Sequence, residues 1–372
     1  MHSVDYSFLQ ALWFILICIL WIGYFVLEGF DFGVGMLLRH LGHNDADRRA
    51  IIHAIGPMWD GNEVWLLTAG GATFAAFPLW YASMFSGFYI ALFLVLFALI
   101  IRGVAFEFWG KDDRPRWRAT WEWAIVIGSF LASLLFGVAW ANIVHGVPIN
   151  AQQNFTGNLF TLLNPYALLG GVTLVLLFIS HGAIYLNMKT GGDLPERARG
   201  VAKWASPAAA VVGIAFLVWT VIDMNDRTGA SVAVAILGAI AAVLLATAAV
   251  SELGRRPGVA FGISTAAIAM LFVTLFVDLF PNVMPSTTSS LYNLTIANTS
   301  SSSKTLAIMA VVAVVMVPIV LAYTAWSYWV FRKRVSPEDF DRTTKNPLDL
   351  VGSGGKSAGT GAGPDPGSAP AG

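Results

Sequence analysis

Long apolar stretches, separated by short polar and charged segments, dominate the chain. A bilayer core about 30 Å thick needs roughly 20 residues of apolar helix to cross it. The pattern predicts an all-α integral membrane protein with nine transmembrane helices, which we expect to form two four-helix bundles plus one peripheral helix. The nine stretches are Phe8–Glu28, Ile55–Phe77, Ala82–Phe106, Thr120–Val144, Leu163–Asn187, Trp204–Asp223, Ser231–Val250, Val259–Phe280 and Leu306–Phe331.

The composition agrees with a membrane protein. Apolar residues make up 56% of the chain and charged residues 12%, and the mean hydropathy is +0.68. Soluble domains carry roughly 25% charged residues, so a soluble fold of this composition would expose too much apolar surface. The net charge is zero, which gives no indication of a nucleic-acid partner. The single cysteine, Cys18, excludes a disulfide framework within the chain and a cysteine-based metal site.

The positions of the basic residues predict the orientation in the membrane. With the nine stretches in place, all 22 lysines and arginines except Arg227 and Lys304 lie on one side of the membrane or close to it. Basic loop residues are retained in the cytoplasm. We therefore expect the N-terminus outside, the C-terminus in the cytoplasm and an odd number of spans.

Two regions are not predicted to cross the membrane. Ser286–Ser303 is rich in Ser, Thr and Asn and is expected to form an outside loop that is too polar to bury. Residues 352–372 contain mostly Gly, Ser, Ala and Pro and are expected to form a flexible linker or a cloning remnant. The transmembrane domain is thus assigned to residues 1–351.

Two acidic residues lie at the end of the first stretch, within the sequence Leu27–Gly35. Glu28 and Asp31 are three residues apart, so a continuous helix would place both carboxylates on one face. The three glycines of this segment instead suggest a helix that loosens or ends there, with close backbone contact. Ionisable residues inside a membrane are costly and usually mark a function.

Four further charges follow in the next two stretches. Asp60 and Glu63 share a helical face, and Asp60 lies on the order of 10 Å inside the cytoplasmic boundary. Two carboxylates this close in a low dielectric do not both ionise, so one can hold a proton. Arg102 and Glu107 lie at the cytoplasmic end of the third stretch, and Arg102 is a natural counter-ion for one of the acids.

The predicted topology brings these six charges to the cytoplasmic half of the first three helices. Two interpretations stay open: a path for protons or water from the cytoplasm, and a buried salt-bridge network that fixes helix register. The candidate proton-path residues are Asp60, Glu63, Asp31, Glu28, Arg102 and Glu107. No catalytic residue and no metal ligand is assigned.

His181 is the remaining candidate for a cofactor site. It lies in the fifth stretch, near the predicted cytoplasmic end. A lone intramembrane histidine could ligate haem, although it more often forms a hydrogen-bonded helix contact. No two histidines occupy facing depths within the membrane, so a bis-histidine haem site within this chain is not expected.

The segments around these charges resemble subunit II of the cytochrome bd-type quinol oxidases. The most specific are Gly29–Gly35 (GFDFGVG) and Trp59–Leu66 (WDGNEVWL) at their mutual spacing. The resemblance covers about Asp5–Asp341. Further matching segments are Thr68–Ala72, Phe85–Tyr89, Arg102–Glu107, Thr156–Phe160, Leu163–Tyr166, Met284–Thr287 and Pro318–Trp326.

The resemblance implies a subunit of a respiratory oxidase in the bacterial cytoplasmic membrane. The larger subunit I would bind quinol and ligate haem b and haem d, and no haem would be ligated by this chain alone. Oxygen would be reduced to water with protons from the cytoplasm. This chain would shield the haems, with Asp60 in the proton path. Membrane lipid, quinone and a small single-helix accessory subunit are the other partners implied. Some relatives have Gln at the positions of Glu63 and His181.

Two other classes of function stay open. A proton-coupled secondary transporter would also need intramembrane acids, but it predicts inverted repeats and paired broken helices. The second half of the chain has few charges and no counterpart of the Asp60 cluster. A purely structural scaffold would use the same acids only to hold helices together.

Overall fold

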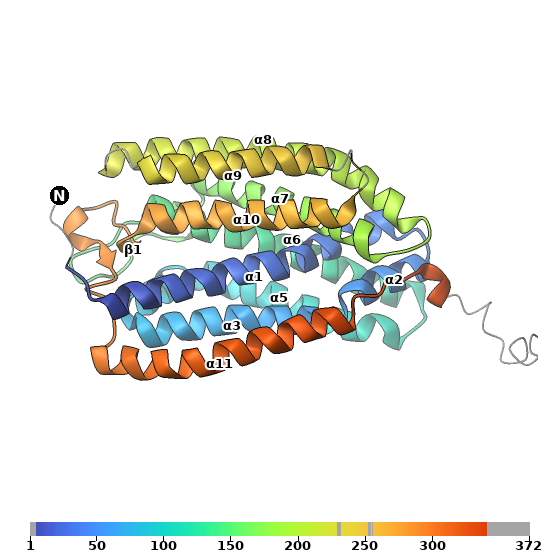
Figure 1. Ribbon diagram of the computed structural model, residues 1–372, viewed down its shortest axis with the longest axis horizontal. Coiled ribbons are helices and arrows are strands. Elements are labelled where there is room, and N and C mark those ends of the chain that lie inside the picture. Colours follow the sequence, from blue (N-terminus) through green and yellow to red (C-terminus); the bar gives the residue numbers. More distant parts are fainter. Residues whose placement is uncertain (1–4, 229–231, 252–253, 255, 341–372) are drawn as a thin grey trace, which may run out of the picture.

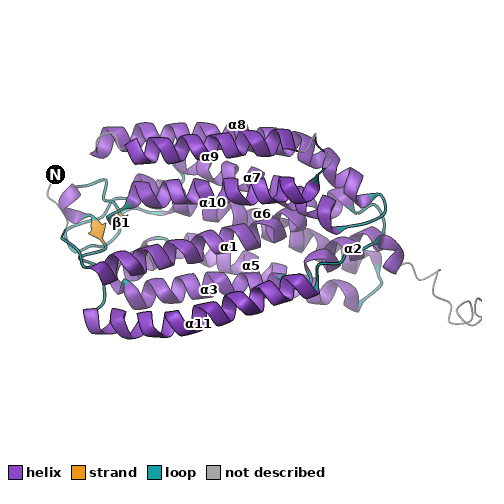
Figure 2. Ribbon diagram, in the orientation of Figure 1, coloured by secondary structure: helices purple, strands orange, loops and turns teal. Residues whose placement is uncertain are grey.

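The computed structural model describes residues 5–228, 232–251, 254 and 256–340. The described chain is a bundle of long, roughly parallel helices, with one small strand pair at the end where α1 begins (Figures 1 and 2). The long helices are α1 (Phe8–Leu41), α3 (Trp59–Ala76), α5 (Tyr89–Phe108), α6 (Pro115–His145), α7 (Pro165–Lys189), α8 (Leu194–Thr228), α9 (Val232–Ser251), α10 (Pro257–Leu279) and α11 (Ser303–Val330). The shorter elements are α2 (Asp45–Ile55), α4 (Pro78–Gly87), η1 (Trp109–Lys111), η2 (Leu159–Leu162), β1 (Asn282–Met284), η4 (Ser290–Tyr292), β2 (Leu294–Thr295) and η5 (Pro337–Phe340).

Eight helices of the described part are long and apolar enough to cross a membrane: α1 and α5 to α11. The helix that falls short is α3, which has 18 residues and carries Asp60 and Glu63 near its start. It lies between α1 and α11 and runs along both (Figure 1). The structure therefore confirms an all-helical membrane protein. Eight of its described helices have the length and apolar composition needed to span a membrane.

Helix α1 is central to the bundle, and it is longer than the sequence suggested. It continues without a break to Leu41 and contacts α3, α6, α7 and α10. The expectation of a loosened or ended helix at the glycine-rich segment is wrong. A Cβ atom at Gly33 would lie 1.8 Å from the carbonyl oxygen of Phe178, so the missing side chain lets α1 and α7 pack backbone to backbone.

Two of the other predicted stretches are shorter than expected or are interrupted. The second, Ile55–Phe77, begins at Trp59 as a helix, because α2 ends at Ile55 and a turn follows it. The third, Ala82–Phe106, is divided into α4 and α5 at Phe88, whose ψ of 16° is not helical. Phe155 packs against Gly87 at this break, where a Cβ atom would be 2.7 Å from it.

The polar segment Ser286–Ser303 is more ordered than an exposed loop. Part of it forms β2, which pairs in antiparallel fashion with β1. Leu294 and Ile296 are fully buried, and Ser301 donates a backbone hydrogen bond to Ala76 at the end of α3. The prediction that this segment is too polar to bury is therefore wrong for its apolar residues, which close one end of the bundle.

Basic residues gather at the opposite end of the bundle and pair with acids there. Arg39 Nη1 lies 2.5 Å from Glu122 Oε2, and Arg197 Nη1 lies 2.9 Å from Asp47 Oδ2. Arg118 pairs with Asp45. The predicted linker at 352–372 lies outside the described residues.

Candidate functional site

The buried charges of α1, α3 and α5 meet in one cluster. Arg102 Nη1 lies 2.5 Å from Glu28 Oε1 and 3.2 Å from Glu63 Oε1. The side chains of Glu28 and Arg102 are 0% exposed, and that of Glu63 is 23% exposed. The counter-ion role expected of Arg102 is confirmed, and it joins three helices that are not adjacent in the sequence.

Asp31 lies beside the same cluster and is held there by a hydrogen bond from the side-chain amide of Asn62. Because α1 is continuous, Asp31 lies one turn beyond Glu28 on the same face. Its Oδ2 accepts a 2.7 Å hydrogen bond from Asn62 Nδ2, and Asp31 is fully buried. The Tyr328 hydroxyl of α11 donates to Asn62 Oδ1 at 3.0 Å. A polar chain therefore runs from α11 through α3 to α1.

Aromatic rings hold the guanidinium in place. The Arg102 guanidinium carbon lies 4.7 Å from the centre of the Phe32 ring and 5.1 Å from that of Phe106. Contacts of this kind stabilise a desolvated cation. The cluster as a whole contains three carboxyl groups and one guanidinium, so it has more acid than base inside an apolar bundle.

The other two predicted site residues lie outside this cluster. Asp60 is exposed at the start of α3, one turn before Glu63. Glu107 is exposed at the end of α5 and lines a surface cleft of about 250 Å³ together with Arg49, His53 and Lys111. Four of the six predicted residues are thus brought together, while Asp60 and Glu107 lie on the surface of this chain.

His181 is fully buried among α1, α7 and α10. Its Nδ1 lies 2.7 Å from Ser264 Oγ, and its ring stacks on Phe261 with the ring centres 4.6 Å apart. The cavity lined by Ser264 and its neighbours has a volume of about 10 Å³, which is close to the size of one water molecule. His181 itself is 0% exposed and its ring is held between Ser264 and Phe261, so its surroundings do not fit a haem.

Several polar residues of this region were not singled out from the sequence. Asn62 lies inside the Trp59–Leu66 segment, next to Glu63, so its position was a usable signal. Tyr328 is 266 residues away from Asn62, and its contact has no local sequence signal. Glu122 was also missed, although an acid at the third position of the fourth apolar stretch is unusual. It is 1% exposed and accepts a hydrogen bond from Trp109 Nε1.

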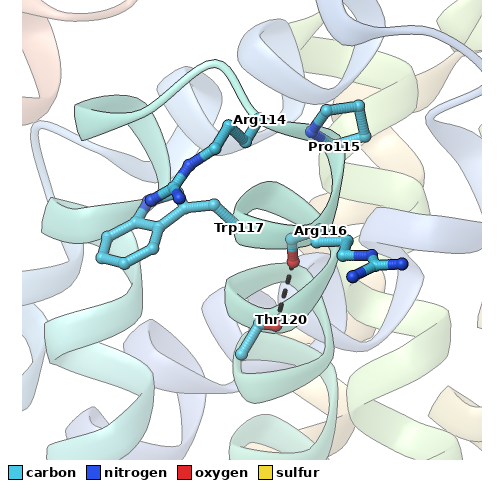
Figure 3. Close-up of a pocket in the computed structure, with 5 residues that line it drawn as sticks. All are labelled: Arg114, Pro115, Arg116, Trp117 and Thr120. Atoms are coloured by element: carbon cyan, nitrogen blue, oxygen red, sulfur yellow. Dashed lines mark hydrogen bonds between the residues drawn. The ribbon is translucent and has the colours of Figure 1, made fainter.

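A pocket at the start of α6 is a weaker candidate than this cluster. The pocket has a volume of about 670 Å³, and Arg114 and Arg116 beside it point in different directions (Figure 3). The two cations do not converge on a ligand. Among the described residues, no group of three or more His, Cys, Asp or Glu side chains is placed to hold a metal ion.

The fold and this site define the chain as an all-helical, multi-pass membrane protein with a buried acid–arginine cluster between its helices. Residues 9–331 match the profile of the family "Cytochrome bd terminal oxidase subunit II". The chain belongs to this family.

Two bacterial relatives support the assignment along nearly the whole chain. The cytochrome bd ubiquinol oxidase subunit 2 of Bacillus subtilis is 44% identical over 337 residues, which cover 89% of this chain and 98% of the relative. The cytochrome bd-I ubiquinol oxidase subunit 2 of Escherichia coli K12 is 41% identical over 374 residues, covering 92% and 99%. A chain in the structure of bd oxidase from Geobacillus thermodenitrificans has the same fold, with a TM-score of 0.65 at 16% identity and coverage of 87% and 99%.

The chain is therefore a multi-pass membrane subunit of a respiratory bd quinol oxidase, an oxidoreductase complex. The family implies haem cofactors and a quinol substrate in the complex, and a subunit 1 as the partner. Membership in an oxidase family disfavours the alternative of a proton-coupled transporter.

Proposed function

We propose that this chain packs on a haem-bearing subunit I and delivers cytoplasmic protons for the reduction of oxygen to water. In this proposal subunit I binds quinol and ligates haem b and haem d, which supply the electron chemistry. This chain contributes the buried carboxyl groups and shields the haems from lipid. The observation that supports it is the cluster of Glu28, Asp31 and Glu63 around the single Arg102.

Charge balance explains why this cluster is suited to proton transfer. One guanidinium neutralises one carboxylate, and a further buried carboxylate without a cation is costly. At least one carboxyl group therefore holds a proton in the resting protein. Asp31 is the best candidate, since its hydrogen bond comes from the neutral amide of Asn62 rather than from a cation. A neutral acid beside an ion pair can release its proton and take up another.

The exposed surface of α3 is the part of this chain that we assign to subunit I. Asp60 is exposed on α3, and a lipid environment around a carboxylate would cost several kcal/mol. A Cβ atom added at Gly61, Gly70 or Gly71 would meet nothing within 4 Å, so this helix can receive another helix at close range. A polar partner helix would satisfy Asp60 and place it between the two subunits.

The entrance of the path is assigned to the basic end of the bundle. This end faces the cytoplasm if basic residues are retained there, as they are in bacterial cytoplasmic membranes. Glu107 lines an open cleft at this end and is close in sequence to Arg102. With α3 as the ninth membrane-crossing helix, α1, α3, α5 and α6 form one four-helix group and α7 to α10 a second, with α11 at the edge.

The substitution Asp60→Asn in the assembled oxidase tests the proposal. It keeps the size of the side chain and removes the proton-carrying group, so quinol-driven oxygen consumption is expected to fall while the haem spectrum is retained. The variant Asp5→Asn, which changes an exposed acid before α1, is the matched control. Unchanged oxygen consumption in Asp60→Asn, or loss of haem together with assembly, would contradict the proposal.

A further inference from the structure

Tyr24 is a buried polar residue that the proton path described above does not use. It lies on α1 one turn before Glu28, so its side chain shares the face of the acid cluster. The residue is 0% exposed, and its hydroxyl has no hydrogen-bond partner among the described side chains and backbone. It is about 6 Å farther from the basic end than Glu28.

Other unsatisfied polar atoms lie in the same place. Glu28 Oε2 and the Nε and Nη2 atoms of Arg102 are buried and, within the described part of the chain, have no hydrogen-bond partner. Tyr24 lies one turn before Glu28 on α1, and its ring contacts the Phe32 ring over which the Arg102 guanidinium lies, so Tyr24 borders the cluster. These atoms include a hydroxyl that can donate and accept, a carboxylate that accepts and a guanidinium that donates.

The surroundings of Tyr24 are aromatic on the remaining sides. The Tyr24 ring packs against Phe136 with the ring centres 5.4 Å apart, and against Phe25 at 5.3 Å. The Tyr24 ring also contacts the Phe32 ring edge-on, with the ring centres 6.4 Å apart. The Arg102 guanidinium lies over the same Phe32 ring. An apolar cage offers no hydrogen bonds, so a polar group inside it must find its partner within the cluster.

We infer that Tyr24, Glu28 and Arg102 enclose a binding site for ordered water, in which the Tyr24 hydroxyl positions the water against the Glu28 carboxylate. Buried polar atoms in proteins are satisfied by such waters when two or more partners converge. The inference rests on the proposed proton path and adds a positioning residue to it. The rings of Phe25 and Phe136 pack against Tyr24, so the water site ends at Tyr24, and the proton is expected to leave toward Glu63 and the exposed surface of α3.

The substitution Tyr24→Phe in the assembled oxidase tests this inference. Loss of the hydroxyl removes one hydrogen-bond partner of the water, so oxygen turnover is expected to fall roughly tenfold to a hundredfold. Turnover is also expected to decline more steeply at high pH than in the wild type, and the ratio of the rates in H2O and D2O is expected to change. Density maps of the wild-type complex are expected to contain a water between Tyr24 and Glu28, and maps of the variant are expected to lack it. Tyr166→Phe, which removes a hydroxyl bonded to Thr220, serves as the matched control and leaves the pH profile unchanged.

The outcomes separate this inference from the proposal on which it rests. A fall in turnover for both Glu28→Gln and Tyr24→Phe, with haem retained, supports both. A fall for Glu28→Gln alone overturns the water site and leaves the proton path standing, and unchanged turnover in both variants overturns the proton path as well. Failure of Tyr24→Phe to assemble also overturns the inference, because a hydroxyl that bonds only water is not needed for helix packing and its removal is expected to be tolerated.

Discussion

The substitution Glu28→Gln separates the proton function of the buried cluster from its structural function. Gln has nearly the same shape as Glu but has no carboxylate and cannot carry a proton in this role. The substitution removes the 2.5 Å ion pair between Glu28 Oε1 and Arg102 Nη1, in which both side chains are fully buried. Arg102 keeps Glu63 at 3.2 Å, so its charge stays partly compensated.

The expected decrease in the free energy of unfolding depends on Glu63, the partner that Arg102 keeps. Removing one member of a buried ion pair costs about 3–5 kcal/mol when the other charge is left alone. Since Glu63 stays in place, we expect about 1.5–3 kcal/mol, the value of a hydrogen bond to a charged group. The subunit is therefore expected to assemble with its haem partner at a reduced unfolding temperature. Turnover is expected to fall by roughly 100-fold, as for loss of a positioned acid–base group.

The matched control is Glu122→Gln in the same subunit. Glu122 is also buried and also lies 2.5 Å from an arginine, Arg39, but it lies outside the cluster around Arg102. Its loss leaves Arg39 and Arg48 facing a neutral amide, so stability is also expected to fall, although by less than for Glu28→Gln because both arginines are partly exposed to solvent, and turnover should be unchanged. Oxygen consumption, haem absorbance and thermal unfolding of both variants give the comparison. Equal turnover in the two variants would refute the reasoning.

Two further predictions concern helix packing and the subunit interface. Gly33→Ala is expected to abolish assembly, because its Cβ atom would lie 1.8 Å from the Phe178 carbonyl oxygen. The control Gly262→Ala, whose Cβ atom would meet nothing within 4 Å, should assemble normally. The yield and haem content of the two purified variants give the comparison. Gly71→Leu, on the exposed surface of α3, is expected to reduce the amount of copurifying subunit I by at least about tenfold. The control Gly258→Leu on α10 should leave that amount unchanged. Equal copurification in the two variants would show that α3 does not contact subunit I.

The apolar helices, and the pairing of Arg102 with one of the nearby acids, could be predicted from the sequence, because both depend on local properties. Apolar runs of the right length predict spans, and a lone arginine among acids predicts an ion pair. The continuity of α1 could not be predicted in this way. The local preference of glycine for a break is overridden by the close packing of Gly33 on α7, which depends on residues far along the chain.

The sequence also could not show which of the six charged residues would meet in the buried cluster and which would lie on the surface. Asp60 and Glu63 are three residues apart, but only Glu63 reaches Arg102, because the rotation of α3 against α1 and α5 decides which side chain points inward. The contact of Tyr328 with Asn62 joins the last long helix to α3 across 266 residues. Such contacts are set by tertiary packing, and no local pattern records them.

Infrared difference spectroscopy of the assembled oxidase, between its oxidised and reduced forms, tests the central claim most directly. The claim is that a buried carboxyl group of this chain holds a proton beside the Glu28–Arg102 pair. The account predicts a band from a protonated carboxyl group that shifts in D2O and disappears in Asp31→Asn but persists in Glu122→Gln. A spectrum without such a band, or a band that is unchanged in Asp31→Asn, would contradict it.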